Sequence, residues 1–345
     1  MKAHRYLNLG ILLLSVVLAL LPCAHAAQYP EARISNGLIA AKLFLPDARK
    51  GYYRSTRFDW SGAVNSLEYK GHSYYGKWYD DVDPKVINKD FPDGKIVNGP
   101  PGALWGPVNE FQTPLGWNEA KPGGTFVKIG VGVLRRGDGN YNRFVMYDIV
   151  DPGNWTVRQH RDSVEFEQTV ADPTSGYAYL YRKVVRLEKD KPNMVIEHSL
   201  KNTGTKEIKS NVYNHNFVVL DHQTPGPDFV FKVPYEIKPL HAPDSALAEV
   251  RGNEVVLKKQ LSGSDEVPMP FRGFSNSAAD NETVIENTKV GAGVKITGDR
   301  PLSMSVFWCV RTVLAVEPYI AIDVQPGAEF TWKDMYEYYT IPAQH

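Results

Sequence analysis

Hydrophobic and polar residues alternate with a period of two along most of the chain after residue 30. Runs rich in β-branched and aromatic residues are separated by turn-forming residues, which is the pattern of strands that bury one face. The strands expected from this pattern cover 34–45, 125–134, 177–187, 193–201, 209–220, 290–297, 302–316, 319–324 and 329–341. Hairpins are expected at 66–78, 155–170 and 249–258, with turns at Lys70-Gly71, Arg161-Asp162 and Gly252-Asn253.

Strand follows strand in this pattern without a helix of three turns or more between them. Such an order excludes a doubly wound parallel sheet, and the number of strands is too large for a small sandwich. We therefore predict an all-β protein, a large antiparallel β-sandwich, with two stacked domains as the alternative. The segment 80–117 differs, because it is rich in Pro, Gly and Asp and shows little alternation. Long irregular loops in compact domains often carry function.

The first 26 residues have the features of a secretory signal peptide. Lys2 and Arg5 precede an apolar run over 10–21, and Ala24-His25-Ala26 supplies a small-x-small cleavage site. Cleavage near Ala26 would leave 27–345 as a single domain, periplasmic or secreted, with no stable membrane insertion after signal removal. A lipid anchor at Cys23 is the alternative, disfavoured by the preceding proline. The mature chain would then keep one cysteine, Cys309, expected to be a buried thiol without a disulfide.

The charge balance argues against a nucleic-acid partner. Lys and Arg together number 39, as do Asp and Glu, so the formal net charge is zero and no basic face is implied. Aromatic residues make up 12% of the chain, with 19 Tyr and 7 Trp, which suits stacking on a flat ligand. The sequence contains no phosphate-binding glycine loop and no zinc-type spacing of Cys or His, so we predict no metal site.

The segment 52–62 is the first candidate for binding chemistry. It holds Arg54, Arg57, Asp59 and four aromatic rings within nine residues. Rings cover the apolar face of a sugar, and guanidinium groups bond its hydroxyls, so the composition suits a carbohydrate. The alternative is an internal pair between an arginine and Asp59 that braces a strand.

His215 and Glu317 are the candidates for acid–base chemistry. His215 lies in a strand, where a lone histidine is usually structural, and its flanking asparagines should face the other way. Glu317 ends the apolar run 313–316, and a carboxylate there is costly unless it is hydrogen-bonded or used. Burial would raise its pKa and suit a general base, whereas a salt-bridged carboxylate is the alternative.

Taken together and in this order, these segments resemble the galactose mutarotase-like, or aldose 1-epimerase, superfamily over about residues 30–342. Val316-Glu317-Pro318, followed by the turn at 324–327, is similar to the Val-Glu-(Pro/Ser)…Leu-x-Pro-Gly pattern of the hexose-phosphate mutarotase branch. The stretch 214–217 resembles the family's His-x-Tyr-Phe-Asn motif, with Val218 in place of its second aromatic residue.

The resemblance implies a β supersandwich that interconverts the α and β anomers of a sugar without a cofactor. Glu317 would be the base and His215 the acid, with Arg57 and Trp60 binding the carbohydrate substrate. The family's further histidine in the first half has no clear counterpart, because His72 has the surroundings of a turn residue. Asn109 and Glu110, in the loop 105–111, would occupy its place. Trp117 would also bind the substrate.

Two other functions stay open at this point. A non-catalytic carbohydrate-binding protein on the same scaffold would depend on its tryptophans, namely Trp60, Trp105 and Trp117. A polysaccharide lyase would need a base beside a group that neutralises a uronic acid, and Tyr213, His215 and Arg57 could serve.

Overall fold

The computed structural model describes residues 29–342. The predicted signal peptide and Cys23 lie outside the described residues, so cleavage near Ala26 and the division into a signal and one domain stay predictions. Nearly all regular structure is β-strand, and the helices are three short 3₁₀ turns, η1 (Pro92–Gly94), η2 (Pro100–Gly102) and η3 (Ala278–Asp280). None of the helices within 29–342 is long and apolar enough to cross a membrane. The prediction of an all-β, antiparallel fold is confirmed.

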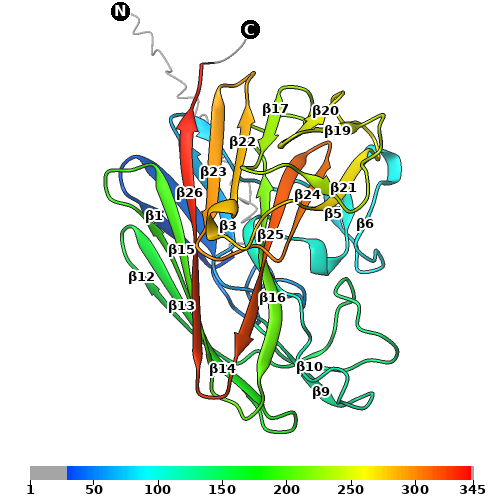
Figure 1. Ribbon diagram of the computed structural model, residues 1–345. Coiled ribbons are helices and arrows are strands. Elements are labelled where there is room, and N and C mark those ends of the chain that lie inside the picture. The colour runs from blue at the N-terminus through cyan, green and yellow to red at the C-terminus, as the bar shows by residue number, and fades with distance from the viewer. Residues whose placement is uncertain (1–28, 343–345) are drawn as a thin grey trace, which may run out of the picture.

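The larger of two main sheets has ten strands (Figure 1). Long strands joined by hairpins build one half of it, and shorter strands from the second half of the chain build the other. In spatial order the strands are β12 (Asn154–Gln159), β13 (Ser163–Asp172), β14 (Tyr177–Leu187), β15 (Asn193–Asn202), β26 (Glu329–Thr340), β23 (Ala292–Gly298), β22 (Glu282–Asn287), β17 (Phe229–Lys232), β20 (Glu254–Leu257) and β19 (Ala248–Arg251). The turn at Gly252-Asn253 joins β19 and β20, as the sequence predicted.

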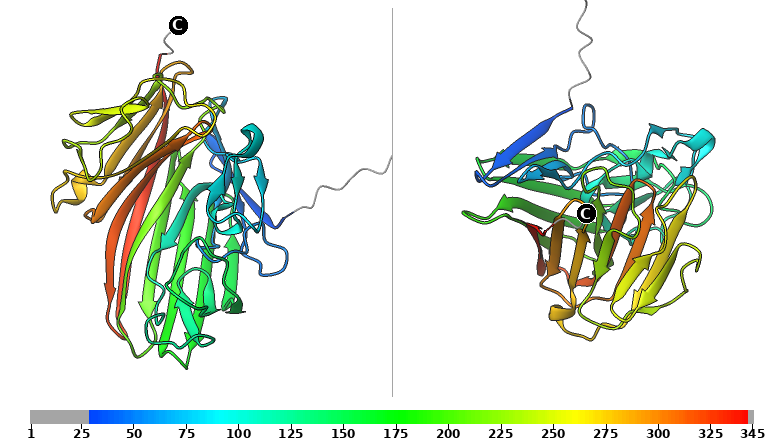
Figure 2. Two further views of the ribbon diagram at one scale, coloured as in Figure 1. Left: turned by 90° about the vertical axis from the view of Figure 1, so that its right-hand side faces the viewer. Right: turned by 90° about the horizontal axis from the view of Figure 1, so that it is seen from above.

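The second main sheet has six strands and carries the candidate site. In spatial order they are β18 (Lys238–Pro239), β21 (Glu266–Arg272), β24 (Met304–Val310), β25 (Val313–Val324), β16 (Ile208–Val218) and β8 (Gly106–Phe111). All of its pairings are antiparallel. Figure 2 shows its long strands running the height of the molecule, with the cyan segment around residue 100 against one side.

Three small sheets complete the fold. One contains β1 (Glu31–Ser35), β2 (Ile39–Phe44), β3 (Val64–Tyr69) and β4 (His72–Ser73), and a second contains β11 (Ile149–Asp151), β10 (Gly132–Arg135) and β9 (Thr125–Lys128). The third contains β5 (Asp81–Val82), β7 (Val97–Asn98) and β6 (Lys89–Asp90). The turn at Lys70-Gly71 joins β3 and β4, which confirms that hairpin.

The core lies between the two main sheets because alternate residues of each strand face inward. Ile196 and Tyr336 of the ten-stranded sheet pack in one cluster with Val316 and Cys309 of the six-stranded sheet. Cys309 is a free, buried thiol, as expected, and burial raises its pKa. The opposite face of the six-stranded sheet is covered by segments from the first half of the chain, through a second cluster that contains Phe217.

The segment 80–117 is less irregular than its sequence pattern indicated. Most of it stays irregular, with three two-residue strands and two 3₁₀ turns, but Gly106–Phe111 is the fully buried strand β8, paired with β16. Alternation is absent there because both faces of the strand are covered, so that polar and apolar residues alike are buried. The prediction of a continuous loop was therefore wrong over β8.

Candidate active site

The site is built on two neighbouring interior strands of the six-stranded sheet, β16 and β25. Tyr213 pairs with Tyr319, and the same register sets His215 directly opposite Glu317. Because side chains alternate along a strand, all four point to the face of the sheet away from the core. Two strands that are about a hundred residues apart in the chain thus bring the predicted acid and base together.

Pro318 interrupts the hydrogen-bond ladder next to this pair. It lies opposite Asn214 in the register of β16 and β25, and a proline has no N–H to donate. The side-chain amide of Asn216 takes over, because its Nδ2 donates to the carbonyl oxygens of Asn214 and Val316, 3.2 Å from each. The asparagines beside His215 therefore face the core, as predicted, and keep the two strands joined where the proline stands.

The two candidate groups are in direct contact. The Nε2 atom of His215 lies 3.0 Å from Oε1 of Glu317, and both side chains are buried. Tyr319 donates its hydroxyl to the other carboxylate oxygen, Oε2, at 2.5 Å. The imidazole stacks on Phe217, with 3.6 Å between ring centres. Its Nδ1 atom has no hydrogen-bond partner among residues 29–342. These contacts fix the planes of both groups.

Glu317 is the ionised member of the pair. Burial by itself would raise the pKa of Glu317, but His215, the charge of Arg143 and the Tyr319 hydroxyl outweigh burial and lower it to about 2. The expectation that burial would raise this pKa is therefore wrong. For His215 burial prevails and lowers the pKa, although the Glu317 carboxylate opposes that shift. The two groups thus differ in proton affinity, as an acid and a base must.

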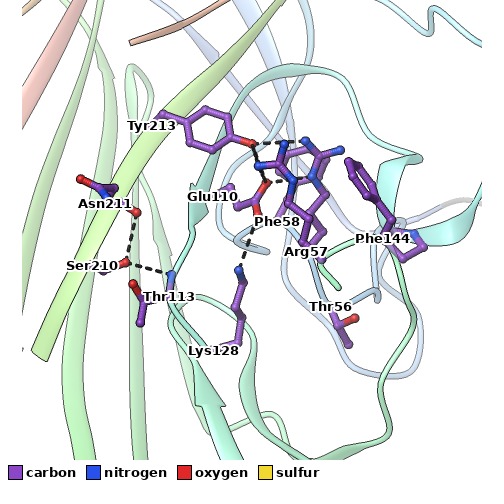
Figure 3. Close-up of polar contacts among 12 residues, drawn as sticks. Thr56, Arg57, Phe58, Glu110, Thr113, Lys128, Phe144, Ser210, Asn211 and Tyr213 are labelled. Carbon is purple, nitrogen blue, oxygen red and sulfur yellow. Dashed lines mark hydrogen bonds and ion pairs between the residues drawn. The ribbon is translucent and has the colours of Figure 1, made fainter. Parts of the chain in front are cut away.

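Arg57 is bound to a second, fully buried carboxylate, that of Glu110 (Figure 3). Its Nε donates to Oε2 of Glu110 at 2.8 Å, and the Tyr213 hydroxyl donates to the same oxygen at 2.5 Å. Lys128 lies 3.6 Å from the other carboxylate oxygen. Burial opposes ionisation of Glu110, but the surrounding cations lower its pKa to about 2. The pairing of an arginine with Asp59 that the sequence left open is wrong, since Arg57 binds Glu110.

The segment 52–60 holds Arg57 in place through its aromatic residues. The hydroxyl of Tyr53 accepts the backbone N–H of Arg57 and of Phe58, at 3.3 and 3.0 Å. Trp60 donates its indole N–H to the carbonyl of Ser55 at 2.8 Å. The segment is therefore a braced loop, and the rings expected to cover a sugar largely brace the arginine.

A further arginine reaches the site from the loop between β10 and β11. Nη1 of Arg143 lies 3.5 Å from Glu110 Oε2 and 3.4 Å from the Tyr213 hydroxyl. Phe144 lies under both guanidinium groups, 4.8 Å from that of Arg57 and 5.1 Å from that of Arg143. The side chain of Arg143 is 30% exposed, so part of it is open to a ligand.

The acid–base pair and the two arginines line a pocket of about 490 Å³. It runs over the outer face of β16, β25, β24 and β21. Residues of the segments 57, 78–112 and 143–144 complete its wall. The residues that line the pocket are Arg57, Trp78, Asn88, Lys89, Asn98, Gly102, Gln112, Arg143, Phe144, His215, Phe217, Glu266, Pro268, Pro270, Met304, Val306, Trp308, Glu317 and Tyr319. Within 29–342, no group of three or more His, Cys, Asp or Glu side chains is arranged to hold a metal ion.

Three of the seven predicted site residues share this pocket, namely Glu317, His215 and Arg57. Glu110 lies directly behind Arg57, fully buried, and does not line the pocket. His72 lies in β4 beside Asp221, outside the pocket lining.

The other three predicted residues lie elsewhere. Trp60 packs behind the pocket, and Trp117 packs with Phe126 and Tyr147 around the small β9–β11 sheet. Asn109 is on the inner face of β8, and both polar atoms of its amide lack a partner among the described residues. None of these three lines the pocket.

Sequence reasoning missed Tyr319 and Arg143. Tyr319 follows Glu317 by two positions, so the strand period alone places both on one face and could have identified it. Arg143 lies in a loop without a pattern, and its position depends on a fold that sequence periodicity does not describe.

The fold is shared with several solved structures. No family model and no curated protein matches the chain. A galactose mutarotase-like protein from Clostridium acetobutylicum is 12% identical, with a TM-score of 0.53, covering 90% of this chain and 95% of that one. A candidate aldose 1-epimerase from Escherichia coli K12 is 11% identical, with a TM-score of 0.51 and coverage of 90% and 99%. Galactose 1-epimerase from Lactobacillus acidophilus NCFM is 12% identical, with a TM-score of 0.50 and coverage of 90% and 94%. The chain therefore has the galactose mutarotase-like fold.

Proposed function

We propose that this chain is an exported, cofactor-independent aldose 1-epimerase-like enzyme, which interconverts the anomers of a sugar. The observation that carries the proposal is the contact between the buried Glu317 and His215 in a pocket of a galactose mutarotase-like fold. A carboxylate and an imidazole within 3.0 Å can reach two oxygens bonded to one carbon, such as the anomeric hydroxyl and the ring oxygen of a pyranose.

In the proposed reaction, Glu317 Oε1 takes the proton of the anomeric hydroxyl while protonated His215 gives its Nε2 proton to the ring oxygen. The bond between the anomeric carbon and the ring oxygen breaks, and the anomeric oxygen becomes a carbonyl. Rotation about the adjacent carbon–carbon bond exposes the other face, and the reverse proton transfers close the ring. No redox change or additional reactant is required.

The sugar would enter between the two groups and separate them. The contact with His215 is one cause of the low pKa of Glu317, so its loss makes the carboxylate a stronger base. Tyr319 keeps its hold on Oε2 and leaves Oε1 for the substrate. Arg57 and Arg143 supply donors for sugar hydroxyls on the β8 side of the pair.

Export is proposed from the residues before 27 alone, through the basic start, apolar run and cleavage pattern. It makes the substrate a sugar available outside the cytoplasm. Detection of the mature chain in the periplasmic or culture fraction, with Gln28 or Ala27 at its N-terminus, would support this part of the proposal.

The test is anomer exchange by NMR on mature protein, with glucose, galactose and other free sugars. We expect exchange above the spontaneous rate, reduced at least about a hundredfold in Glu317→Gln. The variant Glu207→Gln, in a half-buried carboxylate that does not line the pocket, is the matched control and should keep full activity. An unchanged rate in Glu317→Gln would remove this residue from the reaction. Absence of exchange in folded wild-type protein would favour carbohydrate binding without catalysis, or a lyase.

A further inference from the structure

We propose that the pocket contains a second sugar-binding site beside the catalytic pair, so that the substrate is the reducing end of a disaccharide or longer glycan. The inference rests on the proposed function, because it takes the sugar over Glu317 and His215 as the first of two. The second site is the part of the pocket that lies over β24 and β21.

The pocket floor crosses four adjacent strands. Outward from His215 on β16, the register sets Glu317 on β25, Val306 on β24 and Pro270 on β21 in one row. Neighbouring strands lie about 4.8 Å apart, so this row is about 14 Å long. The catalytic pair occupies only its first third, and two strands of floor remain.

The volume of the pocket also indicates room for a second sugar ring. At about 30 Å³ for each water of liquid, 490 Å³ corresponds to roughly sixteen waters. One hexose has twelve carbon and oxygen atoms, linked more closely than waters are, and fills only part of that space. Most of the lining residues lie on the β21 side of the pair, so the surplus volume is there.

The chemistry of this second part suits a sugar. Its floor is apolar, formed by Met304, Val306, Pro268 and Pro270, and such a surface packs against the C–H face of a pyranose. A polar wall stands beside it. A sugar ring needs both, since its hydroxyls project from the edge of an apolar face.

Glu266 is the centre of the polar wall. Its Oε1 accepts from Lys89 Nζ and from the Trp308 indole N–H, each at 2.7 Å. Among the described residues nothing bonds its Oε2, and the side chain is 28% exposed. The carboxylate is thus held in one orientation with a free oxygen for a sugar hydroxyl.

The segment that supplies Lys89 is the irregular stretch whose composition suggested function. Its residues Asn88, Asn98 and Gly102 also line the pocket, and Figure 1 shows β5 and β6 beside β21. The stretch therefore forms the outer wall of the second site. The catalytic pair alone does not explain this irregular stretch, and the second site gives it a role.

Sugar chemistry fixes the direction of the chain. The anomeric carbon must lie at the pair, so a further residue is attached at another carbon and extends away from it. On the β8 side the pocket carries the side chains of Arg57, Arg143 and Phe144. Extension over β24 and β21 is the direction that the lining leaves for a second ring.

The test compares sugars that share a reducing end. Anomer exchange is measured for glucose against cellobiose and maltose, and for galactose against galactobiose. We expect kcat/KM at least about tenfold higher for one of the disaccharides than for its monosaccharide. Equal values throughout would overturn the second site and leave the proposed function intact.

Variants then locate the effect. Pro270→Trp fills the second part, and Glu266→Gln removes its carboxylate acceptor; both should lower disaccharide kcat/KM toward the monosaccharide value, with a much smaller effect on monosaccharide exchange. Glu254→Gln, in an exposed ion pair on β20, is the control and should change neither. If Pro270→Trp does not fold, Glu266→Gln alone decides, and an unchanged disaccharide preference in it contradicts the proposal.

A binding measurement separates the two failures. If no sugar shows exchange, the proposed function fails, and saturation-transfer NMR with cellobiose, maltose and galactobiose tests the site itself. Contacts from the protein to both rings of a disaccharide support the second site. Contacts to one ring, or none, overturn it.

Discussion

At the scale of single residues, the candidate site depends on which atom holds each oxygen of Glu317. Tyr319 donates to Oε2 and His215 contacts Oε1, so the two neighbours divide the carboxylate between them. Tyr213 stacks on Tyr319 with 4.2 Å between ring centres, but donates its own hydroxyl to Glu110. Two similar tyrosines thus position two different carboxylates.

Tyr319→Phe should raise the pKa of Glu317. A hydrogen bond to a charged group is worth about 1.5–3 kcal/mol, which corresponds to roughly one to two pKa units. An NMR titration of the Glu317 carboxyl carbon measures the shift directly, and anomer exchange should slow as the carboxylate loses its orientation. Tyr213→Phe is the matched control, because its hydroxyl serves Glu110 instead. Equal titration of Glu317 in wild type and Tyr319→Phe would contradict the positioning role.

The pH dependence of activity should follow His215. It acts as an acid only when protonated, and burial lowers its pKa below the ordinary value of 6.5. The protonated fraction therefore decreases as pH rises through a value below 6.5, and kcat/KM should decrease with it. Glu317 stays ionised over this range, because its pKa is about 2. A profile of exchange from pH 5 to 8, corrected for the spontaneous rate, checks this, and a decrease centred above 6.5 would exclude the assignment.

At the scale of secondary structure, the interior strand β25 contains a proline, Pro318, directly after the candidate base Glu317. Pro318 removes one ladder donor beside the pair, and Asn216 replaces it from the neighbouring strand. The Oδ1 atom of Asn216 also accepts from the Tyr336 hydroxyl at 2.8 Å, which ties β16 to the facing sheet. One buried amide therefore holds the strand pair together and fixes it against the core.

Asn216→Leu should lower the free energy of unfolding by about 2–3 kcal/mol. The substitution keeps the branched shape of the side chain but leaves two carbonyls and the Tyr336 hydroxyl without their partner in a buried place. Chemical denaturation measures the loss. Tyr336→Phe removes only one of these bonds and should cost about 1 kcal/mol. A loss in Asn216→Leu no greater than that of Tyr336→Phe would show that the ladder does not depend on the amide.

At the scale of the whole molecule, the sandwich buries an ionisable group between its two main sheets. Asp334 of β26 accepts from Asn214 Nδ2 of β16 at 2.7 Å. His198 Nε2 lies 3.8 Å away, but burial holds the pKa of His198 well below its ordinary value, so it gives no positive charge. Burial, with the charge of Asp299 adding to it, raises the pKa of Asp334 to about 7, while Lys183 and Asn214 oppose the shift.

Stability should therefore decrease as pH rises. Asp334 is protonated in the folded chain below about pH 7, whereas in the unfolded chain it ionises near 3.8. Its contribution is present at low pH and is lost as pH rises through 7, by about 2–3 kcal/mol between pH 5 and 8. Asp334→Asn should remove this part of the pH dependence, as denaturation at both pH values would show. The same slope in wild type and variant would contradict the assignment to Asp334.

The sequence by itself determined the class of fold and the direction of each side chain within a strand. Alternation is a local property, since side chains of one strand face two sides in turn, and it correctly placed the asparagines beside His215 on the face opposite to the histidine. It also placed a carboxylate, Glu317, at the end of a buried apolar run, although the strand β25 continues past it to Val324, and it identified the hairpins at Lys70-Gly71 and Gly252-Asn253. Local chemistry sufficed for these features because each depends on neighbours along the chain.

Only the tertiary structure decided which candidates meet. The register of β16 against β25 joins His215 to Glu317, and no local pattern specifies a pairing across about a hundred residues. The aromatic residues show the converse, because Trp60 and Trp117 suited sugar stacking by type but pack away from the pocket. The pKa of Glu317 reversed its expected direction for the same reason: burial was predictable from the sequence, whereas the largest effects that outweigh it come from His215 and Arg143, on distant segments.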